Sequence, residues 1–312
     1  MENEDLEQAK RDEFYKRQVR GIKKFFTNKK FPIIFVIVSI FFIDITIIYL
    51  FLLPSNLEKN ILAISSNNEE VDDGDKDNCN TVGIRLYGDL VTYALNSDQE
   101  NVWDSSLDES SSNGVYFGIK DAKEQEDIKA IVIEVDSFGG IPAAAEEINL
   151  IIKNTDKPVI AYIRNAGLSA AYWAISGADR IFSLSTSQVG SIAITSSYTD
   201  DVKNNEKNGH TFNDLSTGEF KNTFNPNKSL TEKEKKLIMD DLQLTHNIFV
   251  ETVASNRNLD INNVKKIANG WAYTGNEALS LGLVDEIGNL DSVKDYLKNN
   301  ILDGEEAEVC WK

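Results

Sequence analysis

The chain has 312 residues, enough for one large α/β domain or two small ones, and a formal net charge of −18 at pH 7. The charge is uneven, because residues 1–30 hold nine Lys and Arg against six Asp and Glu and the rest of the chain carries −21. Such an acidic body repels nucleic acid and anionic lipid surfaces, so the composition argues against a polyanion-binding function.

Residues 31–54, FPIIFVIVSIFFIDITIIYLFLLP, form an apolar run about long enough to span a bilayer. Its only formal charge is Asp44, which is costly in a membrane and which we expect to face a partner helix or a neighbouring subunit. Basic residues crowd the N-terminal flank, so the positive-inside rule puts residues 1–30 in the cytoplasm and the chain after Pro54 outside. A buried core helix and a cleaved signal peptide are the alternatives, although the run is long for a signal peptide and lacks a small-x-small cleavage pattern.

Residues 55–80 are polar, acidic and rich in Asn and Ser, and they predict a juxtamembrane linker. The two cysteines, Cys79 and Cys310, stand at the two ends of the exported part. A disulfide between them is permitted outside the cytoplasm, but the sequence alone does not establish it. Their terminal positions argue against a catalytic thiol, and their spacing gives no metal-ligand pattern. We expect neither a metal nor a cofactor.

From residue 81 onward the hydrophobic pattern alternates between strands and helices. The predicted strands are 81–91, 129–135, 158–163, 180–184 and 189–194; a surface loop is expected at 96–114, and helices at 141–154, 168–176 and 230–255. Strands without a polar face that alternate with helices imply a parallel sheet covered on both sides. The last third is helical, and its first helix begins with a capping box formed by Thr231 and Glu234.

Gly139 and Gly140 end a buried strand and lead directly into the helix at 141–154. Paired glycines at such a turn let the backbone approach a ligand closely, and the N–H groups of the helix start suit an anion. The turn can therefore be a phosphate cradle, an oxyanion hole or a purely structural turn. Nucleotide binding has little support, because the chain has no GxGxxG motif and no P-loop lysine here.

Ser169 lies one strand later in a second strand-to-helix turn, surrounded by small residues. Two explanations fit it, a helix N-cap and a catalytic nucleophile. The second gains support because both turns would open at the carboxyl ends of parallel strands, where sites form.

A serine nucleophile needs a base, and the chain has only two histidines. His210 lies in a polar loop and His246 in the middle of a helix, so a Ser-His-Asp triad is poorly supported. A lysine can act instead, because desolvation depresses the pKa of buried lysines by several units. The candidate is Lys221, which has Phe220 and Phe224 as apolar neighbours in an otherwise polar segment.

Together these residues resemble the signal peptide peptidase A (SppA) family of membrane-anchored serine proteases, in its short single-domain form. The matching motifs are IVIEVDSFGG (131–140), AGLSAAYWAISGADRIF (166–182), VGSIAI (189–194), GEFKNTFNP (218–226) and NGWAYTGNEALSLGLVDEIG (269–288). The match covers residues 81–298, the expected protease domain, and leaves 299–312 as a C-terminal tail. The resemblance implies an α/β, crotonase/ClpP-like parallel-sheet fold with a helical C-terminal part, and a homo-oligomer.

The same resemblance implies a Ser-Lys dyad. Ser169 matches the family nucleophile, and Lys221 matches the general base 52 positions downstream. Ser191 matches a family serine that hydrogen-bonds to the lysine and orients it. Neighbouring subunits of the homo-oligomer can each supply one member of the dyad.

The resemblance also implies an oxyanion hole made by the backbone N–H groups of Gly139 and Gly140, with a contribution from Ala170. The family usually has Gly where Ala170 and Ala193 stand, and Pro where Phe138 stands. Ala170 keeps its N–H, so the contact survives unless that position requires a positive φ. Phe138 is expected to narrow or redirect the substrate groove.

The function implied is a membrane-anchored serine endopeptidase that cleaves apolar peptides, such as released signal peptides, through an acyl-enzyme. The expected partners are peptide substrates, the lipid bilayer and further copies of the chain, without nucleic acid. The expected location is the cell membrane, with one span, a cytoplasmic N-terminus and an extracytoplasmic protease domain. One alternative is an acyl-CoA enzyme of the same fold, which is disfavoured because such enzymes are soluble and need no serine–lysine pair. The other is an inactive homologue that serves as an oligomeric membrane scaffold or chaperone.

Overall fold

The computed structural model describes residues 79–94 and 109–312. The predicted cytoplasmic segment 1–30, the predicted span 31–54 and all but the last two residues of the predicted linker 55–80 lie outside the described residues. Within the described part, no helix combines the length and the hydropathy needed to cross a membrane. All described residues belong to one compact unit that comprises residues 73–312.

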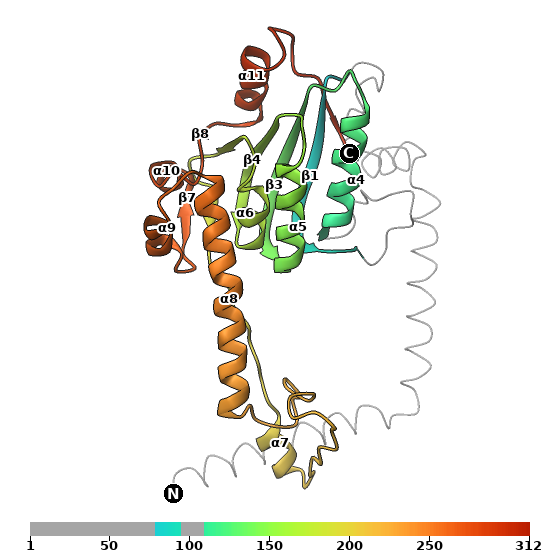
Figure 1. The fold of residues 1–312 in the computed structure, drawn as a ribbon, viewed down its shortest axis with the longest axis vertical. Helices are drawn as coiled ribbons and strands as arrows, with labels where there is room; N and C mark the ends of the chain where they lie inside the picture. Colours follow the sequence, from blue (N-terminus) through green and yellow to red (C-terminus); the bar gives the residue numbers. More distant parts are fainter. Residues whose placement is uncertain (1–78, 95–108) are drawn as a thin grey trace, which may run out of the picture. The chain divides into compact units, whose positions relative to one another are not determined.

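A mixed sheet dominated by parallel pairing forms the centre of this unit (Figure 1). In the described ranges its strands are β1 Thr81–Val91, β2 Glu109–Ser111, β3 Ala130–Gly140, β4 Val159–Leu168, β5 Arg180–Ser183, β6 Gln188–Gly190, β7 Ala272–Thr274, β8 Glu286–Ile287 and β9 Val309–Trp311. The main path runs β2-β1-β3-β4-β5-β8; β6 pairs with β4 and β7, and β9 pairs with β1. Only the β6–β7 pairing is antiparallel among these strands.

Helices cover both faces of the sheet, as the continuous apolar strands predict. The described helices are α4 Ser112–Glu124, α5 Pro142–Lys153, α6 Ala170–Ile175, α7 Val202–Lys207, α8 Glu232–Asn256, α9 Ile261–Ile267, α10 Gly275–Ser280 and α11 Leu290–Asn300. The larger apolar core includes residues of β1, β3 and β4 with residues of α4, α5, α6 and α8. A smaller core on the other side joins Val132, Tyr162 and Phe182 to Val293 and Leu297 of α11. The α/β class is thus confirmed, and its crotonase/ClpP-like type stays a prediction.

The surface loop predicted at 96–114 is wrong at its C-terminal end, because residues 109–111 form β2 and α4 begins at Ser112. Ser111 caps this helix by accepting a hydrogen bond from the Gly114 N–H at 3.0 Å. Val115, Ile119 and Ala122 are buried at helical spacing. The run of serines hid both signals, since serine favours turns and helix caps alike.

The predicted C-terminal tail 299–312 is also wrong, because β9 adds to the edge of β1. Cys79 and Cys310 form a disulfide, with Cα atoms 5.8 Å apart, which secures this edge. Trp311 packs so closely on Gly83 that a Cβ there would lie 2.3 Å from the indole ring. The last residues therefore belong to the folded domain.

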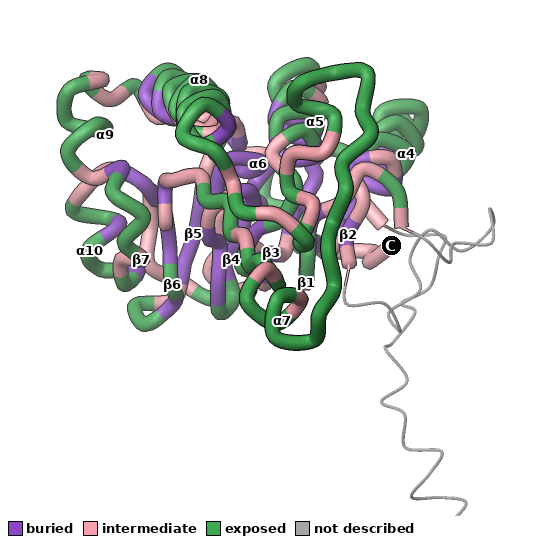
Figure 2. The backbone as a smooth tube through the Cα atoms, turned by 90° about the horizontal axis from the view of Figure 1, so that it is seen from below, coloured by how far each residue is buried: buried purple, intermediate pink, exposed green. Residues whose placement is uncertain are grey.

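Helix α8 carries a segment away from the sheet. Residues 196–248, here called the arm, comprise α7, the loop that follows it and most of α8. Figure 1 shows α7 and the loop at the end of α8 far from the sheet, and Figure 2 shows most of the arm as exposed. The last turns of α8 are held on the body because Phe249 stacks on Trp173 of α6, with ring centroids 4.8 Å apart. The predicted capping box of Thr231 and Glu234 is confirmed at the start of α8.

Candidate functional site

Ser169 occupies a strained turn between β4 and α6. Its φ of 52° and ψ of −123° lie outside the ordinary regions for a side-chain-bearing residue, which stores strain of a kind found at functional sites. It holds the N-cap position, yet its hydroxyl accepts no hydrogen bond from the helix and has no hydrogen-bond partner among the described residues. The N-cap explanation therefore accounts for its position but not for its side chain.

Gly139 packs directly against this turn. A Cβ at Gly139 would lie 2.9 Å from the Ser169 Cβ and 3.3 Å from the Ala170 nitrogen, and the residue has a φ of +123°. Gly140, with a φ of +152°, lies even closer to the end of β1, where a Cβ would be 2.3 Å from the Leu90 carbonyl oxygen. Neither position has room for a Cβ, so both require glycine. The contact of Gly139 with Ser169 places the predicted Gly-Gly turn next to the predicted nucleophile.

The predicted oxyanion donors differ in their present hydrogen bonding. Ala170 begins α6 with an ordinary negative φ, and the first N–H groups of a helix have no intrahelical acceptor. Its methyl group therefore imposes no backbone strain. The Gly139 N–H donates to the Ser137 hydroxyl at 3.2 Å, so this N–H can serve an oxyanion only if that bond gives way. Ser137 is itself fixed, because its hydroxyl donates to the Gly88 carbonyl at 2.6 Å.

A cavity of about 100 Å³ opens beside Ser169. Its lining residues are Gly140, Pro142, Ser169, Ala170, Trp173, Ala193, Ile194 and Thr195. Trp173 lies one helical turn after Ser169 and is almost fully buried. The lining residues that were not predicted as site residues are Pro142, Trp173, Ala193, Ile194 and Thr195. The helical spacing of Trp173 from Ser169 is a sequence signal that could have found one of them.

Ser191 is held close to Ser169 through the backbone. The Ser169 N–H donates to the Gly190 carbonyl at 2.7 Å, and Ser191 follows immediately. Ser191 has a φ of 49°, and its hydroxyl donates to the Gly270 carbonyl at 3.1 Å. The structure thus brings together the turns of Gly139, Ser169 and Ser191, as the sequence predicts.

Lys221 is not brought to this site within one chain. It lies exposed in the arm, in a turn where its N–H donates to the Gly218 carbonyl at 3.1 Å. Its ammonium group has no hydrogen-bond or ion-pair partner in the described parts of the chain. The loop that contains it lies at the end of α8 far from the sheet (Figure 1). Ser169 and Lys221 of one copy are therefore too far apart to form the predicted dyad.

Neither histidine reaches the Ser169 site within one copy. His210 is exposed in the arm, and His246 is half-buried in α8. Neither lines the Ser169 cavity, and neither imidazole ring makes a hydrogen bond or ion pair with a described residue. Within residues 79–94 and 109–312, no group of three His, Cys, Asp or Glu side chains is placed to hold a metal ion.

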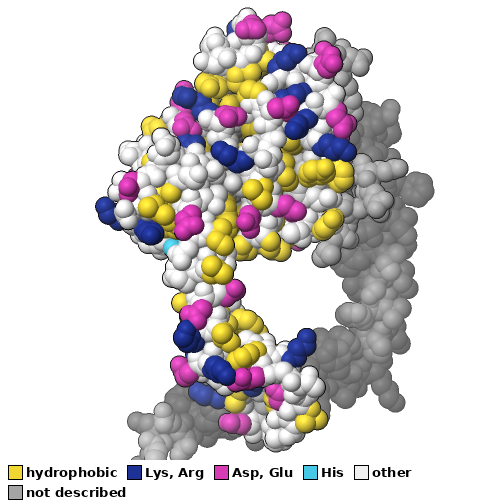
Figure 3. All heavy atoms as spheres, in the orientation of Figure 1, with side chains coloured by type: hydrophobic (Ala, Val, Ile, Leu, Met, Phe, Trp, Pro, Cys, Tyr) yellow, Lys and Arg dark blue, Asp and Glu magenta, His cyan; other side chains and the backbone are white. Residues whose placement is uncertain are grey.

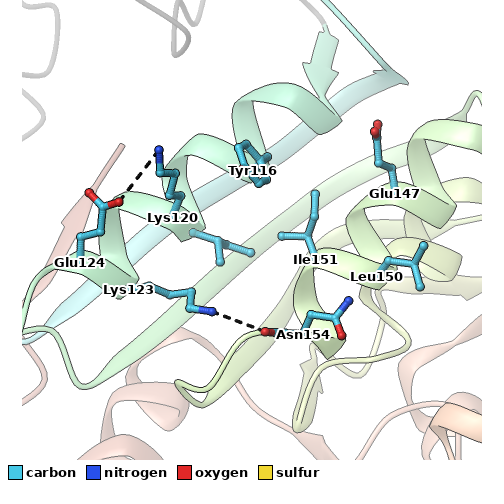
Figure 4. A pocket seen from close by; sticks show the side chains of 9 residues that line it. Tyr116, Lys120, Lys123, Glu124, Glu147, Leu150, Ile151 and Asn154 are labelled. Atoms are coloured by element: carbon cyan, nitrogen blue, oxygen red, sulfur yellow. Dashed lines mark hydrogen bonds and ion pairs between the residues drawn. The ribbon is translucent and has the colours of Figure 1, made fainter.

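A larger cavity, of about 440 Å³, lies between α4 and α5 and shares no residue with the Ser169 cavity (Figure 4). Tyr116, Leu150 and Ile151 give it an apolar lining. Lys123 on its wall donates to the Asn154 carbonyl at 3.5 Å. It contains none of the predicted site residues.

Residues 151–301 match the family model described as Peptidase family S49. The chain is 34% identical over 183 residues to a putative signal peptide peptidase SppA of Enterococcus faecium, covering 58% of this chain and 53% of that protein. It is 32% identical over 176 residues to a putative protease of Methanocaldococcus jannaschii, covering 55% of this chain and 57% of that protein. It is 30% identical over 195 residues to Protease 4 of Haemophilus influenzae, covering 60% of this chain and 31% of that protein. The chain thus spans about half the length of the first two relatives.

These three relatives are all named as proteases or peptidases. The matched segment is similar to Peptidase family S49, and this similarity agrees with the family resemblance predicted from the motifs. Ser169, Ser191 and Lys221 lie inside the matched range, whereas Gly139 and Gly140 precede it.

Proposed function

We propose that the protein is a membrane-anchored serine endopeptidase that cuts apolar peptides with a dyad of Ser169 and Lys221. The observation that carries the proposal is the Ser169 hydroxyl. It stands on a strained turn at the start of a helix, makes no hydrogen bond to a described residue and lines a cavity. A hydroxyl that neither caps the helix nor joins a network is free to attack a substrate.

In the proposed reaction, the neutral amine of Lys221 takes the proton of the Ser169 hydroxyl while Oγ bonds to the scissile carbonyl carbon. The carbonyl oxygen becomes an oxyanion, stabilised by the N–H of Ala170 and by the backbone of Gly139 and Gly140. The lysine then returns the proton to the leaving amine as the C–N bond breaks. A water molecule, deprotonated by the same lysine, hydrolyses the acyl-enzyme and restores Ser169. Ser191 is proposed to orient the lysine.

The lysine is proposed to come from a second copy of the chain, because a single copy holds Lys221 far out on the arm. The arm exposes large apolar side chains, namely Leu215, Phe220, Phe224, Leu237, Met239 and Leu244. Figure 3 shows hydrophobic side chains on this part of the molecule, interspersed with charged ones. An exposed apolar surface of this kind is typical of a protein–protein interface. Burial against a partner would also desolvate the lysine, which favours its neutral form.

The proposed substrate and location are supported by the sequence and by the name of one relative. A relative is named a putative signal peptide peptidase, which supports apolar peptides as substrates. The apolar run at 31–54 is proposed to anchor the protein in the cell membrane, with the protease domain on the extracytoplasmic side.

Single variants of Ser169 and Lys221, expressed separately and together, test whether two copies share the dyad. Full-length protein in detergent should cleave casein and an apolar signal peptide, and Ser169→Ala and Lys221→Ala should each lose nearly all activity. Co-expression of the two inactive variants should restore part of the activity, because one copy then supplies Ser169 and its neighbour supplies Lys221. Full activity in Ser169→Ala would refute the nucleophile, and two inactive variants that never complement would refute the shared dyad.

A further inference from the structure

The loop that carries Lys221 has almost no apolar core of its own. Its backbone bonds are short turns, such as the bond from the Thr223 N–H to the Phe220 carbonyl at 3.2 Å. Phe220 and Phe224, which flank Lys221, are 37% and 44% exposed. Packing within one copy therefore does little to fix the position of the lysine, and polar contacts must do so.

Glu234 supplies these contacts from the first turn of α8. Although it is a glutamate, only 2% of its surface is exposed. One carboxylate oxygen accepts from the Lys228 ammonium at 2.6 Å and from the Thr223 hydroxyl at 3.1 Å. The other accepts from the N–H and the hydroxyl of Thr231, at 2.8 and 2.9 Å. A single carboxylate thus ties the part of the loop that follows Lys221 to the helix.

The charge on Glu234 strengthens these bonds. The hydrogen bond from Lys228, followed by that from the Thr231 N–H, lowers the pKa of Glu234 to about 2. The carboxylate is therefore ionised at neutral pH, and charge-assisted hydrogen bonds are about twice as strong as neutral ones. Buried polar networks that are fully satisfied specify one geometry.

A second ion pair on the loop is much weaker. Lys233 bonds to Glu219 at 2.7 Å, but both side chains are more than half exposed. Ion pairs in solvent contribute little, because water and salt screen them. Asn222, next to Lys221, also bonds to Asp214, but this contact is exposed as well. The Tyr198 hydroxyl holds the loop further on by donating to the Asn225 carbonyl at 2.8 Å. The buried carboxylate nearest to Lys221 is therefore that of Glu234.

From this network we infer that Glu234 is a positioning residue that holds the turn of Lys221 in the conformation in which the lysine reaches Ser169 of a neighbouring copy. The inference rests on the proposed dyad. Glu234 touches no substrate; it acts through Thr223, two residues after Lys221, and through Lys228. Its capping-box role at α8 accounts for two of its four hydrogen bonds, and the other two connect only to the loop.

Glu234→Gln should lower kcat by about tenfold to a hundredfold, since a misplacement of about 1 Å can have that effect. KM should stay within about twofold, because the substrate groove on the body is untouched. Lys228→Met with Glu234→Gln should regain part of the lost kcat, because no unpaired charge then remains in the network. Thr223→Val, which keeps both the cap and the ion pair, should show a smaller kcat loss at unchanged KM.

Glu277→Gln is the matched control. Glu277 forms the same capping box with Thr274 at α10, outside the arm and with no lysine attached. It should leave kcat unchanged, and size-exclusion chromatography should show the same assembly for all variants. An unchanged kcat in Glu234→Gln would overturn the inference. A kcat in the Lys228→Met, Glu234→Gln double variant that is no higher than in Glu234→Gln would do the same. So would a loss of kcat that is accompanied by dissociation of the assembly. Lys221→Ala distinguishes failure of the dyad from failure of the positioning role. If Lys221→Ala is inactive and Glu234→Gln is fully active, only the positioning role of Glu234 is refuted. If Lys221→Ala is fully active, the dyad is refuted.

Discussion

The backbone N–H of Ser169 donates a hydrogen bond to the carbonyl of Gly190, with 2.7 Å between nitrogen and oxygen. This bond joins the turn after β4 to the turn after β6. Because Ser191 follows Gly190, its hydroxyl is placed by the same backbone that places the nucleophile. Two positive-φ serines, Ser169 and Ser191, thus share one rigid frame.

Gly139→Ala tests the contact between the two strand-to-helix turns. The new methyl group would lie 2.9 Å from the Ser169 Cβ, at a φ of +123°. We expect a kcat loss of about a hundredfold from displacement of Ser169 and a stability loss above about 1 kcal/mol. Gly304→Ala is the control, because Gly304 has a φ of +92° with nothing within 4 Å of its added Cβ. It should lower stability and leave peptide cleavage intact; equal activity losses in both variants would contradict the contact.

Tyr172→Phe tests the support beneath α6. The buried Tyr172 hydroxyl donates to the Leu283 carbonyl at 2.8 Å, and burial raises the pKa of this phenol. Removing the hydroxyl leaves a buried carbonyl unpaired, which should lower the free energy of unfolding by about 1–3 kcal/mol in urea denaturation. Tyr93→Phe, at a side chain that is 70% exposed, should change it by less than about 0.5 kcal/mol. Equal effects of the two variants would count against the buried bond.

Acid should loosen the arm before the body. The pKa of Glu234 falls to about 2 in the folded protein from an ordinary value of 4.5. Its stabilisation is therefore complete above about pH 4.5 and is lost as the pH falls from there toward 2. The protection factors of the arm amides, taken relative to intrinsic exchange at each pH, should fall over this range, and Glu234→Gln should show low protection factors at both pH 4.5 and pH 2. An arm whose protection in the wild type does not change with pH would contradict this assignment.

Breaking the disulfide should destabilise the domain without touching the site. Cys79 and Cys310 are separated by 231 positions in sequence, so their bond closes a very long loop in the unfolded chain. Replacing both with serine should lower the free energy of unfolding by about 2–5 kcal/mol. Activity at low temperature should persist, because Ser169 lies at the opposite ends of the strands. The measurement is guanidinium unfolding with and without reductant, and identical midpoints would refute the prediction.

The central sheet and the three turns were predictable because each depends on local signals. The apolar runs of β3 and β4 set the strands, and Gly139 and Ser169 mark the turns at their carboxyl ends. Strand β9 was not predictable, because a three-residue strand is defined by its pairing with β1 and not by its own pattern. Helix α4 was missed because serines precede its first buried hydrophobic side chain, Val115.

The relation of Lys221 to Ser169 could not be read from the sequence alone. A spacing of 52 residues does not say where Lys221 lies relative to Ser169. The loop that contains the lysine lies at the end of α8 that is far from the sheet (Figure 1). One part of the role of Glu234 was predictable, because its capping box with Thr231 is a sequence signal. Its bonds to Thr223 and Lys228 depend on how the loop folds back on the helix, which no local pattern encodes.

The disulfide also determines how the domain bears mechanical force. Cys79 precedes β1, and Cys310 lies in β9 beside the amino end of β1. A pull applied to the chain at Cys79 is therefore transmitted through a covalent bond to a second strand and does not shear β1 alone. Ser169 follows the carboxyl end of the parallel strand β4. The disulfide lies at the amino end of β1, so the disulfide and Ser169 are at opposite ends of the sheet. A pull at Cys79 would therefore act at the end of the sheet opposite to Ser169.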